Sequence, residues 1–330
     1  MILSSDISVI VQGNINKAYT KICLQQIRKI LPKAQIILST WKNSEIEDLE
    51  YDVLILNEDP GASVINFKNN TLNNVNRQLL STKAALRKTN RKFILKTRTD
   101  IYYNDFSFLK LYEQYDYECF NILSHPLLIV NFYTRNPRVL SIPFHPSDWI
   151  LFGYSDDVQK YYSCTNLQNK EDMEYFLYHK NRSPYFVSVI SRFFPEQYLA
   201  ISFFKKVISI KCENFYDNSL ENVNLSEKLF AKFFIVLDYK KQVNMQFMKY
   251  NPNRFFEETT ILNYNMWIIL REHYLLEKHT VQHKIKWLKY LGECMIFKMF
   301  NFYIRRPFVL FLDDLGLKNW MKNLLIKIER

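Results

Sequence analysis

The sequence predicts an α/β protein built on a mostly parallel sheet that is flanked by helices, with a mainly helical C-terminal region. In the first third, short apolar runs rich in β-branched residues alternate with segments of helical periodicity, in the order strand, helix, strand, strand, helix, strand. The predicted strands are continuously apolar rather than alternating with polar residues. This pattern is typical of strands that are buried on both faces.

The elements of the first third follow in order. The predicted strands are 7–11, 35–41, 52–56 and 93–96. A first helix is expected over about 17–31, because its apolar residues recur near helical spacing and Pro32 cannot continue it. A second helix is expected over 76–89. The helices lie between strands, which favours parallel pairing.

The middle of the chain is less regular. The expected elements there are helices at 106–115, at 170–179 and from about 191 onward, and strands at 120–123, 127–132 and 149–153. The first two of these strands would be antiparallel additions to the sheet. Pro195 favours the start of the third helix, because proline is well tolerated in a first helical turn.

The region after residue 200 is mixed at first and then mainly helical and basic, with helices predicted at 267–276 and 283–300. Lysines and arginines lie there among aromatic and aliphatic residues of the same short helices, a combination that suits contact with an anionic membrane surface. A helical cap packed on the sheet, with its aromatic residues in the core, explains the pattern equally well.

Composition limits the kinds of ligand and the way they are bound. The 330 residues carry a net charge of +11, which favours anionic partners such as nucleic acid, acidic lipid or phosphorylated substrates. Only 5 glycines occur, and neither G-x-G-x-x-G nor a Walker A sequence is present. Phosphate binding would therefore depend on side chains and strand-end backbone.

The cysteines and the N-terminus bear on the compartment. The cysteines are Cys23, Cys119, Cys164, Cys212 and Cys294. They form no C-x-x-C pair and no cluster with histidine, so we expect free thiols in a reducing compartment. No secretory signal and no apolar stretch of ~18 residues is evident. We expect a cytoplasmic protein, peripheral at most on the inner face of the cell membrane.

One short motif combines cations with a carboxylate. Lys96, Arg98 and Asp100 alternate directly after the apolar run 93–95. A carboxylate just past the end of a buried strand lies where open α/β sheets place ligand chemistry. The motif suits a site for a phosphate ester, with or without a divalent metal ion. The alternative is a strand end that carries ordinary surface charges.

Several segments together resemble the WavE family of lipopolysaccharide-synthesis proteins, a family associated with glycosyl transfer to bacterial surface polysaccharides. The matching segments are VIVQG at 9–13, LSTW at 38–41, DPG at 59–61, NRQ at 76–78 with ST at 81–82, LKTRTD at 95–100, PSDW at 146–149 with FG at 152–153, and PEQY at 195–198. Their order and spacing carry the resemblance, which covers about residues 7–200.

The resemblance implies a GT-A-like, Rossmann-like fold and a glycosyltransferase that uses a nucleotide-sugar donor. It divides the chain into a catalytic domain at 1–200 and a C-terminal region at 201–330. Within the catalytic domain, 1–105 would bind the nucleotide sugar and 106–200 would bind the acceptor. The acceptor would be a growing lipopolysaccharide or capsule glycan, or a lipid-linked oligosaccharide.

The motif departs from the Asp-x-Asp pair of GT-A proteins. Arg98-Thr99-Asp100 retains only the second carboxylate, so Asp100 would be the single carboxylate ligand of a Mn²⁺ or Mg²⁺ ion. The alternative needs no metal ion, because the Arg98 guanidinium can itself pair with phosphate oxygens in a bidentate manner. Both readings remain open from the sequence.

The remaining donor-binding candidates lie near the ends of predicted elements. Gln12 and Gly13 end the first strand, where base or ribose is expected, although a plain turn also explains Gly13. Arg77 would neutralise phosphate charge together with Lys96 and Arg98 if it is not simply solvated or ion-paired. Asn76 and Gln78 flank Arg77 and would reach the base or ribose.

Trp41 and Asp59 have two interpretations each. A further pair of residues, both carboxylates, are candidates for acid–base catalysis. Trp41 would stack on a base or simply pack, and Asp59 lies in a turn that requires no ligand. Asp148 precedes an aromatic residue that could stack on a sugar, and Glu196 lies at the start of a helix. The base is unassigned between these carboxylates, and His145 is a weaker candidate.

Two rival functions remain. On the same site, a sugar-phosphate transferase would pass a hexose 1-phosphate and release a nucleoside monophosphate. A basic nucleic-acid-binding module is the more remote alternative. The basic residues are spread widely and no nucleic-acid motif is recognised, so we expect no nucleic-acid partner.

Overall fold

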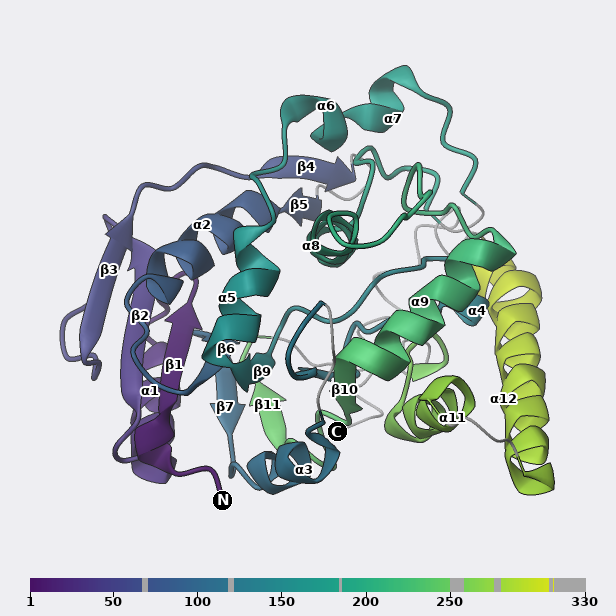
Figure 1. Ribbon diagram of the computed structural model, residues 1–330. Coiled ribbons are helices and arrows are strands. Elements are labelled where there is room, and N and C mark those ends of the chain that lie inside the picture. The colour runs from purple at the N-terminus through teal and green to yellow at the C-terminus, as the bar shows by residue number, and fades with distance from the viewer. Residues whose placement is uncertain are drawn as a thin grey trace.

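The computed structural model describes residues 1–66, 71–117, 122–183, 186–249, 258–275, 280–308 and 311 (Figure 1). A seven-stranded sheet forms its centre. Its strands are β1 (Ile7–Gln12), β2 (Gln35–Trp41), β3 (Val53–Asn57), β6 (Phe93–Arg98), β8 (Leu127–Val130), β9 (Leu151–Tyr154) and β10 (Phe234–Leu237). Their order in the sheet is β10-β8-β9-β6-β1-β2-β3.

The sheet is mostly parallel. β1 pairs in parallel with both β2 and β6, β2 pairs in parallel with β3, and β10 pairs in parallel with β8. Only β9 runs antiparallel to its neighbours, β6 and β8. All six residues of β1 are buried, which explains its continuous apolar run. The expected α/β class and its GT-A-like form are confirmed.

Helices cover the sheet, and smaller ribbons lie at its margins. The helices are α1 (Thr20–Ile30), α2 (Val75–Leu86), α3 (Phe108–Tyr115), α4 (Pro137–Leu140), α5 (Ser155–Ser163), α6 (Lys170–Met173), α7 (Tyr175–Tyr178), α8 (Pro195–Phe204), α9 (Leu220–Phe233), α11 (Tyr264–Leu275) and α12 (Val281–Met299), with a short 3₁₀ turn (Ser4–Asp6) and a π-helical turn (Phe300–Arg305). The small strands are β4 (Ser63–Asn66), β5 (Thr71–Asn73), β7 (Ile101–Tyr103) and β11 (Met245–Phe247). β4 pairs with β5, and β7 pairs with β11.

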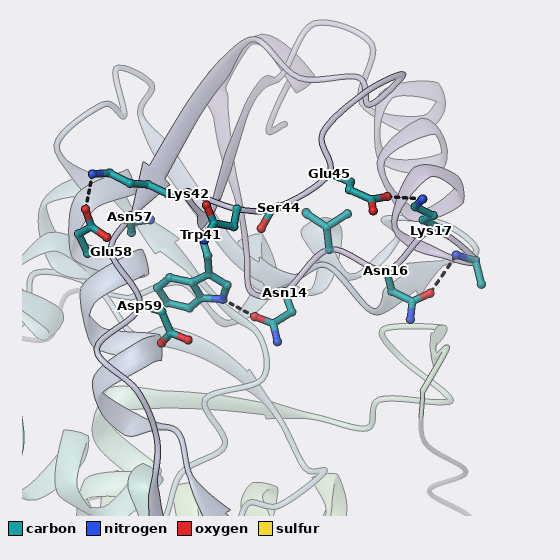
Figure 2. A pocket seen from close by; sticks show the side chains of 13 residues that line it. Asn14, Asn16, Lys17, Trp41, Lys42, Ser44, Glu45, Asn57, Glu58 and Asp59 are labelled. Carbon is teal, nitrogen blue, oxygen red and sulfur yellow. Dashed lines mark hydrogen bonds and ion pairs between the residues drawn. The ribbon is translucent and has the colours of Figure 1, made fainter.

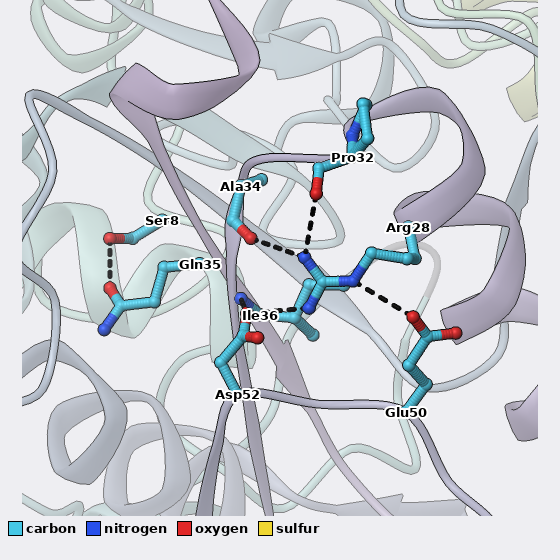
Figure 3. A network of polar contacts seen from close by, with 8 residues as sticks. All are labelled: Ser8, Arg28, Pro32, Ala34, Gln35, Ile36, Glu50 and Asp52. Carbon is cyan, nitrogen blue, oxygen red and sulfur yellow. Dashed lines mark hydrogen bonds and ion pairs between the residues drawn. The ribbon is translucent and has the colours of Figure 1, made fainter.

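The first half of the sheet has two distinct edges. At the amino edge of β2 and β3, the Arg28 guanidinium at the end of α1 donates to the carbonyl of Ala34 at 2.8 Å and to Asp52 Oδ2 at 2.7 Å (Figure 3). Asp52 Oδ2 also accepts the backbone N–H of Ile36 at 2.7 Å. This network joins α1 to the start of both strands and leaves the opposite, carboxyl edge for loops.

The helix predicted over 170–179 is wrong as one element, because the chain forms α6 and α7 with Glu174 between them. The backbone N–H of Phe176 donates to the carbonyl of Ile190 at 2.8 Å instead of to that of Asp172. The Asp172 carbonyl accepts the backbone N–H of Arg192 at 2.8 Å. A tertiary contact therefore replaces the hydrogen bond that a continuous helix would need.

The chain after residue 200 contributes to the same sheet and then forms a helical layer. β10 follows α9 and pairs with β8 at the sheet edge. α11 packs on α9 and on α12, and α12 lies at the side of the molecule opposite β3 (Figure 1). None of the helices in the described ranges is long and apolar enough to cross a membrane. The division at residue 200 remains a prediction.

Parts of some predictions lie outside the described residues. These parts are the first half of the strand expected at 120–123, together with Cys119, and the basic residues of the last segment, 312–330. The run at 127–132 forms β8, shorter than expected, and the run at 149–153 forms β9, shifted toward the C-terminus. Four cysteines in the described residues are free: Cys23, Cys164, Cys212 and Cys294.

Candidate functional site

The carboxyl ends of β1, β2 and β3 surround a cavity of about 850 Å³ (Figure 2). Because parallel strands end at the same edge of a sheet, the loops that follow them converge there. The lining residues are 14–18 after β1, 41–45 at the end of β2 and 57–59 at the end of β3. The cavity is large enough for a nucleoside, which falls within the usual size of a small-molecule site.

Polar side chains fix the walls of this cavity. The Trp41 indole N–H donates to the side-chain oxygen of Asn14, so the ring is held beside the opening (Figure 2). The Asn57 amide donates to Ser39 Oγ and to the Thr40 carbonyl, both at 2.9 Å. These hydrogen bonds fix three side chains that face the cavity before any ligand binds, which lowers the entropic cost of binding.

Charged pairs surround the same opening. Lys42 pairs with Glu58, and Lys17 pairs with Glu45 (Figure 2). Asp59 accepts two hydrogen bonds from Arg77, Nε to Oδ1 at 2.7 Å and Nη2 to Oδ2 at 2.6 Å. Asp59 also accepts the backbone N–H of Gly61 at 2.9 Å, as expected for a turn.

The tip of β1 is packed against the tip of β6. The Gln12 side chain is buried, and its Oε1 accepts the Ser81 hydroxyl at 3.0 Å. Gly13 has φ +126°, and a Cβ there would lie 3.3 Å from Thr99 Oγ1. The conformation and the close approach both favour glycine. Gln12 and Arg98 are paired residues in the register of β1 and β6.

The three candidates in the first turn of α2 lie in different surroundings. Asn76 exchanges two hydrogen bonds with the backbone of Gln168, at 3.0 and 2.7 Å. Arg77 donates to Asp59, which lines the cavity, while Arg77 itself does not. The Gln78 side chain is directed toward the buried Tyr162 hydroxyl, whose pKa burial raises and Gln78, with a weaker effect, lowers. The hydrogen bonds of Asn76 are therefore used within the protein, and Gln78 is turned toward a buried hydroxyl group.

Arg98, the last residue of β6, forms a closed pair with Asp100. Arg98 Nε donates to Asp100 Oδ1 at 2.8 Å, and Nη2 donates to Oδ2 at 2.7 Å. The guanidinium carbon lies 4.0 Å from the ring centroid of Trp149, a cation–π contact. The Asp100 side chain is 7% exposed. Both carboxylate oxygens of Asp100 are thus engaged by Arg98, which also faces an aromatic ring.

Lys96 lies at the centre of the charged cluster. Its side chain is fully buried, and its ammonium donates to the backbone carbonyl of Asp148. Burial, with a smaller contribution from the Arg98 charge, lowers the pKa of Lys96 to about 8, while Asp148, Glu196 and Asp100 oppose the shift. All four charged groups therefore lie within electrostatic range of one ammonium.

Glu196 and His145 face each other beside Lys96. Burial, followed by the charge of Asp148, raises the pKa of Glu196 to about 8, against the influence of Arg135 and Lys96. Burial, followed by the Arg135 charge, lowers the pKa of His145 to about 3, so its imidazole is neutral at pH 7. His145 Nε2 lies 3.6 Å from Glu196 Oε2, a contact too long for a hydrogen bond.

The tautomer of His145 follows from its second nitrogen. Nδ1 lies 3.0 Å from the Tyr133 carbonyl, which can only accept, so Nδ1 carries the proton. Nε2 therefore presents a lone pair toward Glu196. A protonated Glu196, favoured by its raised pKa, faces that lone pair without a negative charge. Because both groups are neutral, the contact does not bury an unpaired charge.

The loop that carries His145 is strained. Tyr133, Ser141 and Phe144 all have positive φ, at 64°, 58° and 57°. Such values are uncommon for residues other than glycine and cost on the order of 1–3 kcal/mol each. They hold Tyr133 and His145 in contact, and the backbone N–H of Arg135 donates to the His145 carbonyl at 3.0 Å.

Sequence reasoning missed several residues of this region. Arg135 influences the pKa of both Glu196 and His145, yet it lies in an irregular segment with no periodicity to mark it. Asn14 and Asn57 line the cavity just beyond strand ends, and their position after an apolar run could have identified them. Trp41 and Asp59, which sequence alone left ambiguous, both line the cavity.

The predicted site residues are divided between one charged cluster and neighbouring strand and helix ends, and none of the predicted catalytic or donor-binding residues lines the cavity itself. Lys96, Arg98, Asp100, Asp148 and Glu196 interact in one cluster. Gln12 and Gly13 adjoin it through the register of β1 with β6. No group of three or more His, Cys, Asp or Glu side chains suited to a metal ion occurs in the ranges described. Asp100 is an oxygen ligand of the type that Mn²⁺ and Mg²⁺ accept, so it fits as a single protein ligand.

The sheet, the cavity at its carboxyl edge and the charged cluster define a GT-A-like α/β protein with a cavity at its strand ends. The chain belongs to the WavE lipopolysaccharide synthesis family, whose model matches residues 7–301. The match extends about a hundred residues beyond the segments that carried the resemblance in the sequence. No curated protein matches the chain.

Proposed function

We propose that this protein is a glycosyltransferase that moves a sugar from a nucleotide-diphosphate donor to a growing bacterial surface glycan. Membership of the WavE family supports a role in lipopolysaccharide synthesis. The observation that carries the proposal is the cavity of about 850 Å³ at the carboxyl edge of β1–β3, adjacent to a cluster of buried cations and carboxylates. A nucleoside and a diphosphate require these two environments side by side.

The nucleoside would occupy the cavity. Trp41 offers a ring for stacking on the base, and Asn14 and Asn57 offer amide groups for its polar edge or for ribose. Arg77 reaches the same wall through Asp59. The diphosphate would then lie toward Gln12 and Gly13, where the tip of β1 leads into the charged cluster.

The leaving diphosphate gains negative charge during transfer, and cations stabilise that charge. Arg98 is suited to this role because its guanidinium can exchange the two oxygens of Asp100 for two phosphate oxygens. Lys96 adds a buried positive charge when it is protonated. Asp100, once released by Arg98, would hold a divalent metal ion, which would neutralise diphosphate charge when bound.

Acid–base work falls to the two carboxylates near Lys96. A general base is most effective when its pKa lies near the working pH, and that of Glu196 is raised to about 8 by burial. We assign Glu196 to the acceptor proton. Asp148 precedes Trp149, whose ring holds Arg98, and its carbonyl accepts the Lys96 ammonium, so we assign the Asp148 side chain to donor sugar or acceptor hydroxyl contacts.

The acceptor and the compartment belong to the same proposal. The acceptor would be a lipopolysaccharide or capsule-type glycan, free or lipid-linked, and the net charge of +11 favours an anionic carrier or membrane surface. Free thiols at Cys23, Cys164 and Cys212 fit the reducing cytoplasm.

The proposal is tested first by ligand binding. The full chain is heated with each of UDP, GDP, CDP, ADP and dTDP, with and without Mn²⁺. One nucleoside diphosphate should raise the unfolding temperature selectively, because a ligand at ~100 times its Kd stabilises the native state by about 2.7 kcal/mol. The Trp41→Ala variant should lose that shift. Equal small shifts with every nucleotide would contradict a nucleotide-specific cavity.

Turnover tests the chemistry. With the sugar nucleotide of the identified base, release of nucleoside diphosphate supports glycosyl transfer, whereas release of nucleoside monophosphate supports hexose-1-phosphate transfer. Asp100→Asn should abolish turnover while the protein stays folded, since Arg98 loses its anionic partner and any metal ion loses its ligand. Asp172→Asn, which disrupts an Arg–Asp pair away from the cluster, is the matched control. Wild-type turnover by Asp100→Asn would remove Asp100 from the site.

A further inference from the structure

α12 presents an apolar stripe to solvent. Six of its apolar residues are more than half exposed: Val281 (73%), Ile285 (60%), Leu288 (66%), Met295 (61%), Ile296 (64%) and Met299 (53%). They recur at i, i+4, i+7, i+14, i+15 and i+18, so they share one face of the helix, which we call the outer face of α12. Gly292 lies at i+11, near the middle of this face, and no other atom lies within 4 Å of the position that a Cβ would take there.

The opposite face of α12 holds the helix on the protein. Tyr290 and Cys294 are buried there, and the Tyr290 hydroxyl donates to Glu227 of α9 at 2.6 Å. The helix is therefore fixed with its outer face pointing away from the rest of the molecule, along the margin that Figure 1 shows. With 19 residues it offers an apolar strip of roughly 28 Å.

Lysines flank the outer face. Lys284, Lys289 and Lys298 are exposed, and none of them forms an ion pair within the described part of the chain. Lys284 and Lys289 lie on opposite sides of the stripe, because they follow Val281 by three and eight residues. Glu293 is the one acidic residue of α12. The surface thus combines an apolar strip with positive borders.

A groove of about 280 Å³ opens beside this face, between α12 and the start of α9. Leu220, Val223, Leu291 and Met295 provide its apolar lining, and Lys298 stands at its edge. Leu220 is itself 69% exposed. The groove extends the apolar strip toward α9. Like the strip, it is an apolar surface with a lysine beside it.

We propose that the outer face of α12 docks on a bilayer that contains anionic phospholipid. An apolar helix face with lysine borders matches the interface between acyl chains and negatively charged headgroups, where apolar burial and charge attraction act together. The net charge of +11 adds a long-range attraction to the same surface. This inference rests on α12 and its groove, and it stands whether or not the charged cluster transfers sugar.

The charge pattern favours lipid over a second copy of the chain. In a symmetric dimer built on this face, each lysine border would meet a lysine border or an apolar strip of the other copy. Glu293 alone on each α12 could not neutralise Lys284, Lys289 and Lys298. Anionic headgroups supply the missing counter-charge.

The test is co-sedimentation of the purified full chain with vesicles. Vesicles of phosphatidylcholine with 30% phosphatidylglycerol should bind the protein, vesicles of phosphatidylcholine alone should bind it much less, and added salt should weaken binding. Leu288→Ser with Ile296→Ser should lower the partition coefficient at least about tenfold, because two large apolar side chains no longer insert. Lys284→Glu with Lys289→Glu should abolish the preference for phosphatidylglycerol.

The control is Ile22→Ser with Val187→Ser, which removes two apolar side chains, 47% and 62% exposed, far from α12 in sequence. It should bind vesicles as the wild type does. All variants change exposed residues, so unfolding temperatures and nucleotide-induced shifts should be unaltered. Absence of vesicle binding, equal binding by the Leu288/Ile296 variant, or a solution dimer that this variant dissociates would each overturn the proposal.

Discussion

At the scale of single residues, attraction between neighbouring opposite charges partly offsets the cost of burying the charged cluster. Lys96 is fully buried and Glu196 is nearly so, and each shifts the pKa of the other toward its charged form. Burial acts more strongly and in the opposite sense on both groups. The result is a pair of groups whose pKa values both lie at about 8, close to neutral pH.

Glu196→Gln should change the pH dependence of stability in a defined direction. The pKa of Glu196 is about 8 in the folded state and about 4.5 ordinarily, so the folded state favours the protonated carboxyl group. The resulting contribution to the free energy of unfolding is fully present below about pH 4.5. That stability is lost as the pH rises through about 8. Glutamine stays neutral, so the variant should unfold at a higher temperature than the wild type at pH 9, and the two should converge near pH 5.

The same substitution should lower transfer about a hundredfold or more if Glu196 is the general base. Wild-type transfer should rise with pH up to about 8, as the carboxyl group loses its proton. Glu174→Gln, a partly exposed helix-end carboxylate, is the control and should follow the wild-type unfolding curve. Parallel unfolding curves for wild type and Glu196→Gln between pH 5 and 9 would contradict a shifted carboxyl group.

At the scale of elements, the two glycines Gly13 and Gly292 should respond in opposite directions to alanine. Gly13→Ala places a Cβ 3.3 Å from Thr99 Oγ1 at φ +126°, so we expect it to lower the free energy of unfolding by about 1–2 kcal/mol. Gly292→Ala meets no atom within 4 Å inside α12 and should raise it by up to about 1 kcal/mol.

Urea denaturation of both variants measures these changes. Gly13→Ala should also weaken nucleotide binding, because relief of the contact moves Thr99 and the tip of β6 beside Arg98. Gly292 lies far along the chain from this site and should leave nucleotide binding unchanged. Equal effects of the two substitutions on stability would show that the backbone of Gly13 relaxes without cost.

At the scale of the whole molecule, one carboxylate joins the C-terminal helices to the rest. Glu227 of α9 accepts Arg138 of α4 through Nε at 2.7 Å and Nη2 at 2.6 Å. It also accepts the hydroxyl groups of Tyr274 in α11 at 3.0 Å and Tyr290 in α12 at 2.6 Å. Its side chain is fully buried, so the placement of α12 depends on a single satisfied network.

Glu227→Ala should lower the free energy of unfolding by about 3–5 kcal/mol, because it leaves the half-buried Arg138 charge without its partner. Limited proteolysis should then cut near α12 before it cuts the sheet. Glu221→Ala, on the exposed side of the same helix, should cost no more than about 1 kcal/mol. Similar unfolding free energies and similar proteolysis of the two variants would show that other contacts hold α12.

The sequence predicted the sheet well in its first third, and the reason is local. β2 occupies the predicted range, and β1, β3 and β6 differ from prediction by one or two residues at an end. Continuous apolar runs between helical segments favour strands that are buried on both faces, as β1 is, although β3 at the sheet edge keeps such a run with Leu56 40% exposed. The strand-end position of Lys96, Arg98 and Asp100 followed from the same pattern.

What the sequence alone determined is therefore the α/β class, the family resemblance and the chemistry available at one strand end. Only the tertiary structure decided that Arg98 closes on Asp100, that Asn76 is tied to Gln168, and that Glu196 lies against His145. It also decided that α12 turns an apolar face outward. These features arise between segments distant along the chain, and burial, which sets each pKa and each exposed face, exists only once those segments pack.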